Sequence, residues 1–430
     1  MGNNEKLGSG GGQDSSFDTL RDMPEFTAPK QDSIDALVGF GYTEEDAVKI
    51  TSAHGVSSLK DSTLSENISR NFAFLQELGY SQEDVMKMAK LLPAILNLSI
   101  DNIKQKISDM QELGYTQEEV VKMARLMPSI YDYSIDNIKQ KFSDVKELGY
   151  SNEEVLKMTK SMPAIYGYSI DSMKQKISDM QELGYTQEDV VKMAKSWPSI
   201  YSLSADNVKQ KVSDMQELGY TQEDVVKMTK ILPTIYGLSI DNMKQKISDM
   251  QELGYTKDEV IKMTKSLSSI FGLSIDNMKQ KISDMQELGY TQEEVLEMTK
   301  SLPTIFSYSI DSMRKKLSDV QELGYSQEEV MEMTKTLPTI YGLATRNLKQ
   351  KIAFYDSIGM HDLAVNDTKC LMQGVALSYA RYQFLTNEEG VKIDNDNYKL
   401  LFWGQRYFAK RYGYNNDEIK RKYPYDGEKE

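Results

Sequence analysis

Basic side chains recur every 35 residues in this 430-residue chain, and their spacing suits contact with a line of phosphates. The first row of cations comprises Lys104, Lys139, Lys174, Lys209, Lys244, Lys279, Arg314 and Lys349. The second row follows two positions later and comprises Lys106, Lys141, Lys176, Lys211, Lys246, Lys281, Lys316 and Lys351. At about 8–10 Å per packed helix layer, eight such positions would extend over roughly 70 Å, or about 20 base pairs of a duplex. Because the repeats are nearly identical, these cations would contact the phosphate backbone rather than distinguish bases.

Pairing within the chain explains the same basic residues without a ligand. Lys209 stands three positions after Asp206, so the two can pair along one helix. A third row lies where the first helix of each repeat ends, a place that favours any cation; it comprises Lys90, Arg125, Lys160, Lys195, Lys230, Lys265, Lys300 and Lys335. For this row, and for a fourth that runs from Lys87 to Lys262, we favour the intramolecular explanation. For the first two rows both explanations stay open.

The C-terminal part of the chain mixes cations with aromatic rings. The candidate nucleic-acid-binding residues there are Arg381, Arg406, Lys410 and Arg411. Arginine and aromatic side chains together can hold a nucleic-acid backbone and stack on its bases. The same rings can instead close the open end of a repeat stack, which is the interpretation we favour. The two roles are compatible.

Side chains that usually catalyse reactions or bind metals are scarce. The two histidines, His54 and His361, are far apart and show no metal-ligand spacing. Cys370 is the single cysteine, and the glycine-rich segment at residues 8–12 does not follow a strand, as a phosphate-binding loop would. Carboxylates recur in every repeat at helix-capping positions, whereas a catalytic pair would be expected once. We therefore expect no enzyme, no cofactor and no metal site.

The elements that position the basic rows follow from the sequence of one repeat. Thr186 begins the motif Thr-Gln-Glu-Asp, which resembles a capping box and predicts a helix over 187–196. Pro198 ends that helix and can start a short turn. A serine then caps a second helix over 205–217, whose apolar residues have helical spacing, and Gly219 ends it. Each repeat is thus predicted to be helix, short turn, helix.

An unbroken period of this kind predicts a helical-repeat solenoid, because one unit alone cannot bury its apolar stripe. The expected fold is all-α, with a superhelix of right or left hand. We expect residues 1–30 to be a disordered acidic and Gly/Ser-rich tail and residues 31–79 to be a degenerate N-terminal capping repeat. Residues 80–359 form the eight repeats, and residues 360–430 form a C-terminal cap with a short basic and aromatic tail.

Charge and hydropathy limit the partners and compartments. The net charge is −14, so a strongly basic nucleic-acid footprint is absent at this level. No run of 18 apolar residues occurs, so we expect no membrane association through a spanning helix. The N-terminal segment has neither the apolar core of a signal peptide nor the arginine-rich composition of an organelle transit peptide. These features favour a cytoplasmic or nucleoid-associated monomer.

The repeat resembles that of the mitochondrial transcription termination factor (mTERF) family. The resemblance rests on Pro-x-Ile-(Tyr/Phe/Leu)-x-(Leu/Tyr)-Ser, followed by Lys-x-Lys, and then Leu-Gly-Tyr-(Thr/Ser)-x-(Glu/Asp)-x-Val. The sequences at 376–385, 397–402 and 407–413 are similar to the C-terminal ending of such proteins, so the resemblance covers about residues 75–413. It implies a left-handed superhelix of two α-helices and one 3₁₀ helix per unit. It also implies binding of double-stranded DNA, or sometimes RNA, in a positive groove, with roles in transcription or its termination and no enzyme activity.

Two functional hypotheses follow. The first is nucleic-acid binding, directed to the backbone of double-stranded DNA rather than RNA, with a role in transcription termination or regulation. The alternative is a protein-binding helical-repeat scaffold, including a secreted or effector protein. The acidic net charge, the near-identity of the repeats and the lack of a transit sequence favour this alternative. The two differ in which charges line the groove of the solenoid: the lysine rows for the first, with the capping acids outside, and acids for the second, which would suit a basic protein partner.

Overall fold

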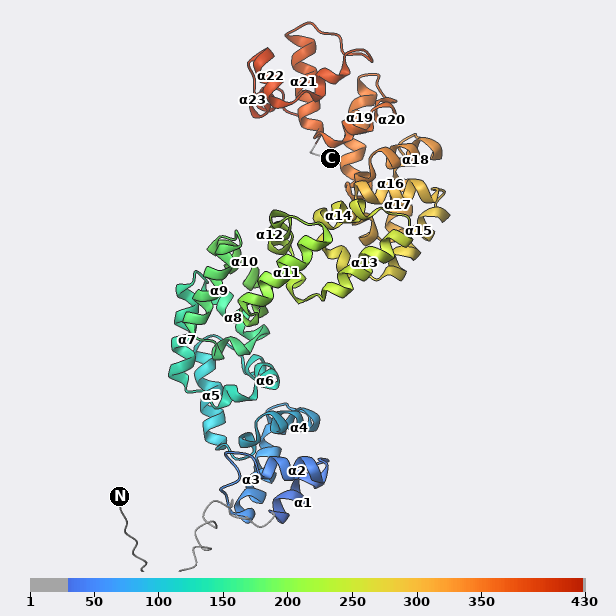
Figure 1. The fold of residues 1–430 in the computed structure, drawn as a ribbon. Coiled ribbons are helices and arrows are strands. Elements are labelled where there is room, and N and C mark those ends of the chain that lie inside the picture. The colour runs from blue at the N-terminus through green and yellow to red at the C-terminus, as the bar shows by residue number, and fades with distance from the viewer. Residues whose placement is uncertain (1–29, 428–430) are drawn as a thin grey trace, which may run out of the picture. The chain divides into compact units, whose positions relative to one another are not determined.

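A computed structural model describes residues 30–427, and the chain divides into two compact units, Met1–Lys174 and Gln175–Glu430. Helices and short turns make up both units, and the described residues contain no strand (Figure 1). This confirms the predicted all-α helical-repeat solenoid. None of the described helices is long and apolar enough to cross a membrane. The predicted tail falls, but for residue 30, outside the described residues.

Unit 1 begins with three helices and continues with repeats of α-helix, 3₁₀ helix and α-helix. Its elements are α1 (Gln31–Gly39), α2 (Glu44–Thr51), α3 (Asp61–Glu77), α4 (Gln82–Leu91), η2 (Pro93–Leu96), α5 (Ile100–Glu112), α6 (Gln117–Leu126), η3 (Pro128–Tyr131), α7 (Ile135–Glu147), α8 (Asn152–Ser161) and η4 (Pro163–Gly167). The boundary between the units falls inside α9 (Ile170–Glu182).

Unit 2 continues the same pattern and ends in a group of shorter helices. Its repeat elements are α10 (Gln187–Ser196), η5 (Pro198–Ser202), α11 (Ala205–Leu218), α12 (Gln222–Ile231), η6 (Pro233–Gly237), α13 (Ile240–Glu252), α14 (Lys257–Ser266), η7 (Ser268–Gly272), α15 (Ile275–Glu287), α16 (Gln292–Ser301), η8 (Pro303–Ser307), α17 (Ile310–Gln321), α18 (Gln327–Thr336), η9 (Pro338–Gly342) and α19 (Thr345–Ser357). The C-terminal elements are α20 (Leu363–Asn366), η10 (Thr368–Met372), α21 (Val375–Asn387), η11 (Tyr398–Phe402), α22 (Gln405–Tyr412) and α23 (Asn416–Lys422).

The first helix of a repeat has well-defined ends, as α12 shows. Thr221 and Asp224 form the predicted capping box: the Thr221 hydroxyl accepts from the Asp224 amide, and the Asp224 carboxylate accepts from the Thr221 amide. Both bonds satisfy amides that the helix itself leaves without acceptors. At the other end Leu232 adopts φ −131° and ψ 81°, as expected of a residue before proline. Pro233 then begins η6 at a position where no amide hydrogen is needed.

The second helix presents one apolar stripe to the core. In α13 a Ser239 hydroxyl caps the start, and Met243 and Met250 are each no more than 1% exposed. Gly254 ends the segment with φ +110°, a conformation that side-chain-bearing residues rarely adopt. The Tyr255 amide then donates back to the Met250 carbonyl (3.3 Å), which closes the turn that leads into the next repeat.

Buried hydroxyl groups join each repeat to the next. The Tyr220 hydroxyl lies 2.7 Å from the Thr264 hydroxyl, which in turn donates to the carbonyl of Val260. The equivalent pairs are Tyr115–Thr159, Tyr185–Thr229, Tyr255–Thr299 and Tyr290–Thr334. Because a buried hydroxyl without a partner costs free energy, each pair favours one alignment of neighbouring repeats.

The two ends of the chain depart from the repeat sequence but retain a capped first helix at the N-terminus and the order of repeat elements near the C-terminus. At the N-terminus the Asp61 carboxylate, at the start of α3, accepts hydrogen bonds from the amides of Asp32 and Ser33 and so caps α1. Near the C-terminus α20, η10 and α21 follow the order of a repeat. There the Tyr355 hydroxyl donates to the carbonyl of Cys370 (3.0 Å). Aromatic side chains of the last helices pack on this end of the core.

Candidate nucleic-acid interface

The first basic row lies on the exposed face of the second helix of every repeat. Unit 1 carries Lys104, Lys139 and Lys174 in this row, and unit 2 carries Lys209, Lys244, Lys279, Arg314 and Lys349. All eight are exposed. In α13, for example, Lys244 follows the buried Met243 and is rotated about 100° from it around the helix, toward solvent.

Acidic side chains share the face of the first row. The Lys209 ammonium lies 3.4 Å from a carboxylate oxygen of Glu182, and the Lys139 ammonium lies 3.7 Å from that of Glu112. In both pairs the acid comes from the end of the preceding second helix, not from the position three residues back. Arg314 alone in this row pairs within its own helix, with Asp311 at 3.1 Å. Because the side chains of the Lys209–Glu182 pair are 51% and 64% exposed, solvent screens it and it is weak.

The second basic row lies inside the repeat stack. Seven of its lysines, all except the half-buried Lys141, are only 3–9% exposed. The ammonium groups of six of these lysines donate to backbone carbonyls of the following repeat, in the pairs Lys106–Tyr133, Lys211–Leu238, Lys246–Leu273, Lys281–Tyr308, Lys316–Leu343 and Lys351–Leu371. Burial lowers the pKa of all seven of these lysines, although for Lys246 the charge of Asp249 acts in the opposite direction.

Burial corrects the expectation that two parallel rows face one ligand. Lys246 stands three positions after Met243 and four before Met250, so it belongs to the same helical face as the apolar stripe. Lys244 stands about 200° away from it around the helix. The spacing of Lys246 from the apolar residues of its helix was present in the sequence but was not used in the prediction. The second row therefore holds neighbouring repeats together and is removed from the candidate interface.

The third row joins repeats through ion pairs with the capping boxes. Seven of the eight cations reach back to the capping-box acid, or its equivalent, of the preceding repeat: Lys90–Asp46, Arg125–Asp84, Lys160–Glu119, Lys230–Asp189, Lys265–Asp224, Lys300–Glu259 and Lys335–Glu294. The intramolecular explanation favoured for this row holds for these pairs, but the partner is an acid 41 residues away, or 44 for Lys90, rather than the row's own helix terminus.

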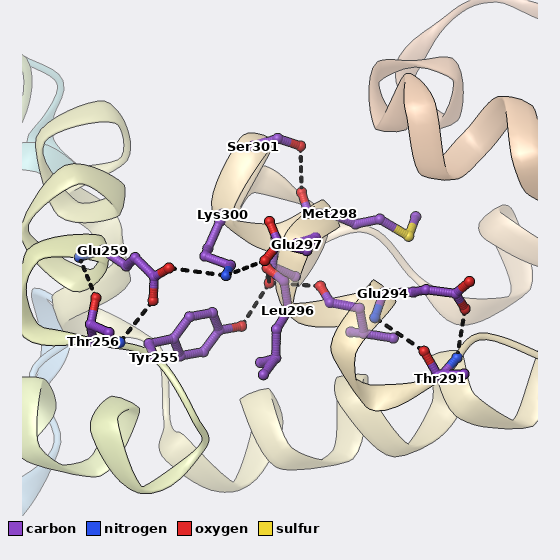
Figure 2. A network of polar contacts seen from close by, with 12 residues as sticks. Tyr255, Thr256, Glu259, Thr291, Glu294, Leu296, Glu297, Met298, Lys300 and Ser301 are labelled. Atoms are coloured by element: carbon purple, nitrogen blue, oxygen red, sulfur yellow. Dashed lines mark hydrogen bonds and ion pairs between the residues drawn. The ribbon is translucent and has the colours of Figure 1, made fainter.

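Figure 2 shows one of these junctions. Lys300 points at Glu259, with its ammonium nitrogen 3.0 Å from the carboxylate, and it also contacts Glu297 of its own helix at 2.5 Å. Glu259 at the same time closes the capping box of Thr256. The side chain of Tyr255 extends from the same repeat toward the helix that carries Lys300 (Figure 2). One carboxylate thus both starts α14 and anchors α16.

Three of the six lysines in the fourth row pair along their own helix, in line with the intramolecular explanation favoured for this row. The exposed pairs Lys87–Glu83, Lys122–Glu118 and Lys227–Glu223 have separations of 2.7, 2.8 and 2.7 Å. Such exposed pairs four residues apart stabilise a helix by only about 0.3–0.5 kcal/mol. These lysines lie on the first helices, away from the first row.

The four C-terminal cations fall into two groups. Arg381 is 1% exposed: its guanidinium donates to the carbonyls of Leu401 and Trp403, and burial lowers its pKa to about 10. It fastens η11 onto α21 and is removed from the candidate interface. Arg406, Lys410 and Arg411 are exposed on α22.

The cysteine and one of the histidines, which lie outside the basic rows, pack against other residues of the fold. The thiol of Cys370 is buried, which raises its pKa to about 12. His361 stacks on Tyr325 and lies 2.5 Å from a carboxylate oxygen of Asp356. Within residues 30–427, no group of three or more His, Cys, Asp or Glu side chains is arranged to hold a metal ion.

Comparison with known proteins identifies the family of the chain. The mTERF family model matches residues 10–180, 175–287 and 279–361, which together cover most of the sequence. The resemblance noted for residues 376–413 lies beyond that match. No curated protein matches the chain significantly. The chain belongs to the mTERF family, a nucleic-acid-binding repeat family that acts in transcription termination or regulation and is not typically enzymatic.

Proposed function

We propose that this protein binds double-stranded DNA as a monomer, mainly through the phosphate backbone, and so regulates or terminates transcription. Its site of action is then the cytoplasm or the nucleoid. The observation that carries the proposal is the first basic row: one exposed cation stands at the same position of the second helix in every repeat. The interface consists of that row together with Arg406, Lys410 and Arg411.

The spacing of the first row supports contact with several phosphates at once. Within unit 2 the row supplies five cations, and successive second helices pack about 8–10 Å apart. A duplex offers one negative charge per ~1.7 Å of its axis, so a phosphate is within reach of each long side chain. The exposed partners of the row, such as Glu182, contribute about 0–1 kcal/mol each, so a phosphate can replace them.

The uniformity of the row supports backbone contact rather than base reading. Seven of the eight positions are lysine, which contacts phosphate as a mobile point charge. Reading a base sequence would need different hydrogen-bonding side chains in successive repeats. Neighbouring exposed positions such as Asn242 and Gln245 recur almost unchanged from repeat to repeat.

A second candidate function is binding of a basic protein partner. It is favoured by the acids that share the exposed face of the second helix: Asp241 and Glu252 flank Lys244 on α13, and all three are exposed. The charges on this face are therefore mixed, and the net charge of the chain is negative. Binding measurements decide between the two candidates.

The test measures the affinity for random-sequence duplex DNA across a series of salt concentrations. Each displaced phosphate counterion contributes roughly 0.9 to the slope of log affinity against log salt. The triple variant Lys209→Gln, Lys244→Gln, Lys279→Gln should lower that slope by about 2–3. Its matched control, Lys192→Gln, Lys227→Gln, Lys262→Gln, removes three exposed fourth-row charges from the same three repeats and should leave the slope nearly unchanged.

Two outcomes would overturn the proposal. If the salt slope fell equally in the two triple variants, DNA binding would depend on the net charge of the protein and not on the first basic row. Failure to bind any duplex at low salt, where electrostatic attraction is strongest, would favour the protein-binding candidate. Duplex RNA measured in the same series tests the preference for DNA.

A further inference from the structure

A hollow beside α22 combines aromatic walls with two cations. It has a volume of about 500 Å³ and is lined by Trp403, Gly404, Tyr407, Lys410 and Arg411. This volume lies within the roughly 300–1,000 Å³ of pockets that take small molecules. The capping role expected for the C-terminal aromatic residues does not explain a hollow of this kind.

Tyr407 is exposed, whereas the aromatic residue next to it is buried. Its side chain is 73% exposed, whereas the adjacent Phe408 is 1% exposed and packs against Phe384 with ring centroids 6.0 Å apart. An aromatic ring in water loses the free energy that burial would give it. Phe408 does the packing of α22 against the core, so Tyr407 contributes nothing to that contact.

Trp403 is held in place by contacts of its backbone and its ring with neighbouring residues. Its carbonyl accepts a hydrogen bond from the buried Arg381 at 2.6 Å, and its ring stacks on Tyr412 at 6.4 Å with an interplanar angle of 27°. The residue that follows, Gly404, leaves the hollow open. A Cβ atom at position 404 would lie 3.9 Å from the Tyr407 ring, in ordinary contact, so a larger side chain there would project into the hollow.

The two cations lie on the same face of α22 as the tyrosine. Lys410 and Arg411 stand three and four positions after Tyr407, one helical turn along. Within the described part of the chain neither forms an ion pair, and the guanidinium carbon of Arg411 lies 6.0 Å from the centroid of the Tyr412 ring. Their charges are thus available to an anion that lies against the aromatic rings.

We propose that this hollow binds one unpaired nucleotide of a nucleic acid, with the base against Tyr407 and Trp403 and the phosphate on Lys410 and Arg411. An aromatic surface beside a pair of cations matches a planar base attached to a phosphate. A base inside a duplex is covered on both faces by its neighbours. The site therefore selects a single-stranded end or gap next to the duplex that the first basic row holds. This inference rests on the proposed function and shares Lys410 and Arg411 with it, whereas the aromatic residues Trp403 and Tyr407 belong to the nucleotide site alone.

The experiment compares a blunt duplex with the same duplex carrying a short single-stranded overhang. The full-length protein should bind the overhang form on the order of tenfold more tightly, which is the scale of one base stacking on an aromatic ring. Tyr407→Ala and Gly404→Leu should each abolish that preference without changing the affinity for the blunt duplex. Tyr407→Phe keeps the ring and should retain the preference, and Lys399→Gln is the control for an exposed cation outside the hollow.

A spectroscopic measurement reports on the hollow directly. The chain has two tryptophans, Trp197 and Trp403, so the variant Trp197→Phe leaves Trp403 as the single reporter. Addition of a short single-stranded oligonucleotide should quench its fluorescence, and Gly404→Leu should prevent that quenching. Circular dichroism checks that each variant is folded.

The outcomes separate this inference from the proposed function. An equal affinity of the natural protein for both DNA forms, or an equal loss of affinity for both forms in Tyr407→Ala, overturns the nucleotide site but not the proposal that the protein binds duplex DNA. Conversely, quenching by the oligonucleotide with no measurable binding of blunt duplex supports the nucleotide site and overturns the proposed duplex interface.

Discussion

The buried ammonium group of Lys246 on α13 donates a hydrogen bond to the backbone carbonyl of Leu273, which lies 27 residues later in the following repeat. Lys244, two positions earlier, is exposed. These two lysines of one helix therefore have separate roles: one joins repeats and the other faces solvent.

Substitution of these two lysines should separate stability from binding. Lys246→Ala leaves the Leu273 carbonyl without its donor and removes a packed aliphatic stem, so the free energy of unfolding should fall by about 1–3 kcal/mol. Lys244→Ala should change it by less than about 0.5 kcal/mol while weakening DNA binding. Urea denaturation followed by circular dichroism measures the first effect, and a DNA titration measures the second. A destabilised Lys244→Ala protein would contradict the assignment.

Alkaline pH should relieve part of the cost of burying Lys246. Burial lowers the pKa of Lys246, so the folded protein binds this proton less tightly than the unfolded chain does. The cost is fully present below the lowered pKa. The free energy of unfolding should therefore rise with pH until the pKa of an unfolded lysine, about 10.4, is reached. Because buried tyrosines ionise in the unfolded chain over part of the same range, the measured quantity is the difference between the natural protein and Lys246→Ala.

Acid should weaken the junction between Asp224 and Lys265, whose charged atoms are 2.7 Å apart. Burial acts to raise the pKa of Asp224, but the hydrogen bonds from Lys265 and from the Thr221 cap outweigh it, and the pKa is lowered overall. The stabilisation is therefore present above about pH 4 and is lost as the pH falls through the lowered pKa. At pH 7 the free energy of unfolding of Asp224→Asn should be about 0.5–1 kcal/mol lower than that of the natural protein. As the pH falls, the free energy of unfolding should decrease less in Asp224→Asn than in the natural protein.

A double-mutant cycle isolates this junction from the other effects of each substitution. Asp224→Asn and Lys265→Met should be less than additive in the free energy of unfolding, because either one breaks the same pair. Lys122→Met, which removes an exposed cation at the equivalent position three repeats earlier, is the matched control and should be additive with Asp224→Asn. Additivity of the Asp224–Lys265 pair would show that the contact contributes nothing.

Local features of the fold could be predicted from the sequence because their causes are local. The capping box of Thr221 and Asp224 spans three residues, and Pro233 and Gly254 impose their backbone conformations on the chain around them. The period of 35 residues then implies that every repeat does the same. This is why the two α-helices of the repeat, predicted over 187–196 and 205–217, match α10 and α11 to within one residue at their ends, while the 3₁₀ helix between them was predicted from the sequence only as a short turn.

The candidate site could be predicted only in part, because exposure depends on the neighbouring repeat. The partner of Lys246 is 27 residues later and that of Lys300 is 41 residues earlier. A cation in a periodic sequence looks the same whether it meets a phosphate or the next repeat. The apolar stripe around Lys246 was the one local signal that distinguished these cases.

The hollow at Tyr407 had no such signal in the sequence, because which of the many C-terminal aromatic rings is exposed depends on how the helices pack.

The sixth repeat offers a stabilising substitution that the other repeats suggest. Ser268 begins η7, whereas proline begins the other 3₁₀ helices of the eight repeats. The preceding Leu267 already adopts φ −139° and ψ 82°, nearly the same as Leu302 before Pro303, at −138° and 80°. Ser268→Pro therefore fits the backbone without strain and restricts the unfolded chain, so the free energy of unfolding should rise by about 0.4–1 kcal/mol. The reverse change, Pro303→Ser, should lower it by a similar amount, and both are measured by urea denaturation. A loss of stability in Ser268→Pro would mean that the amide of Ser268 makes a contact that the other repeats lack.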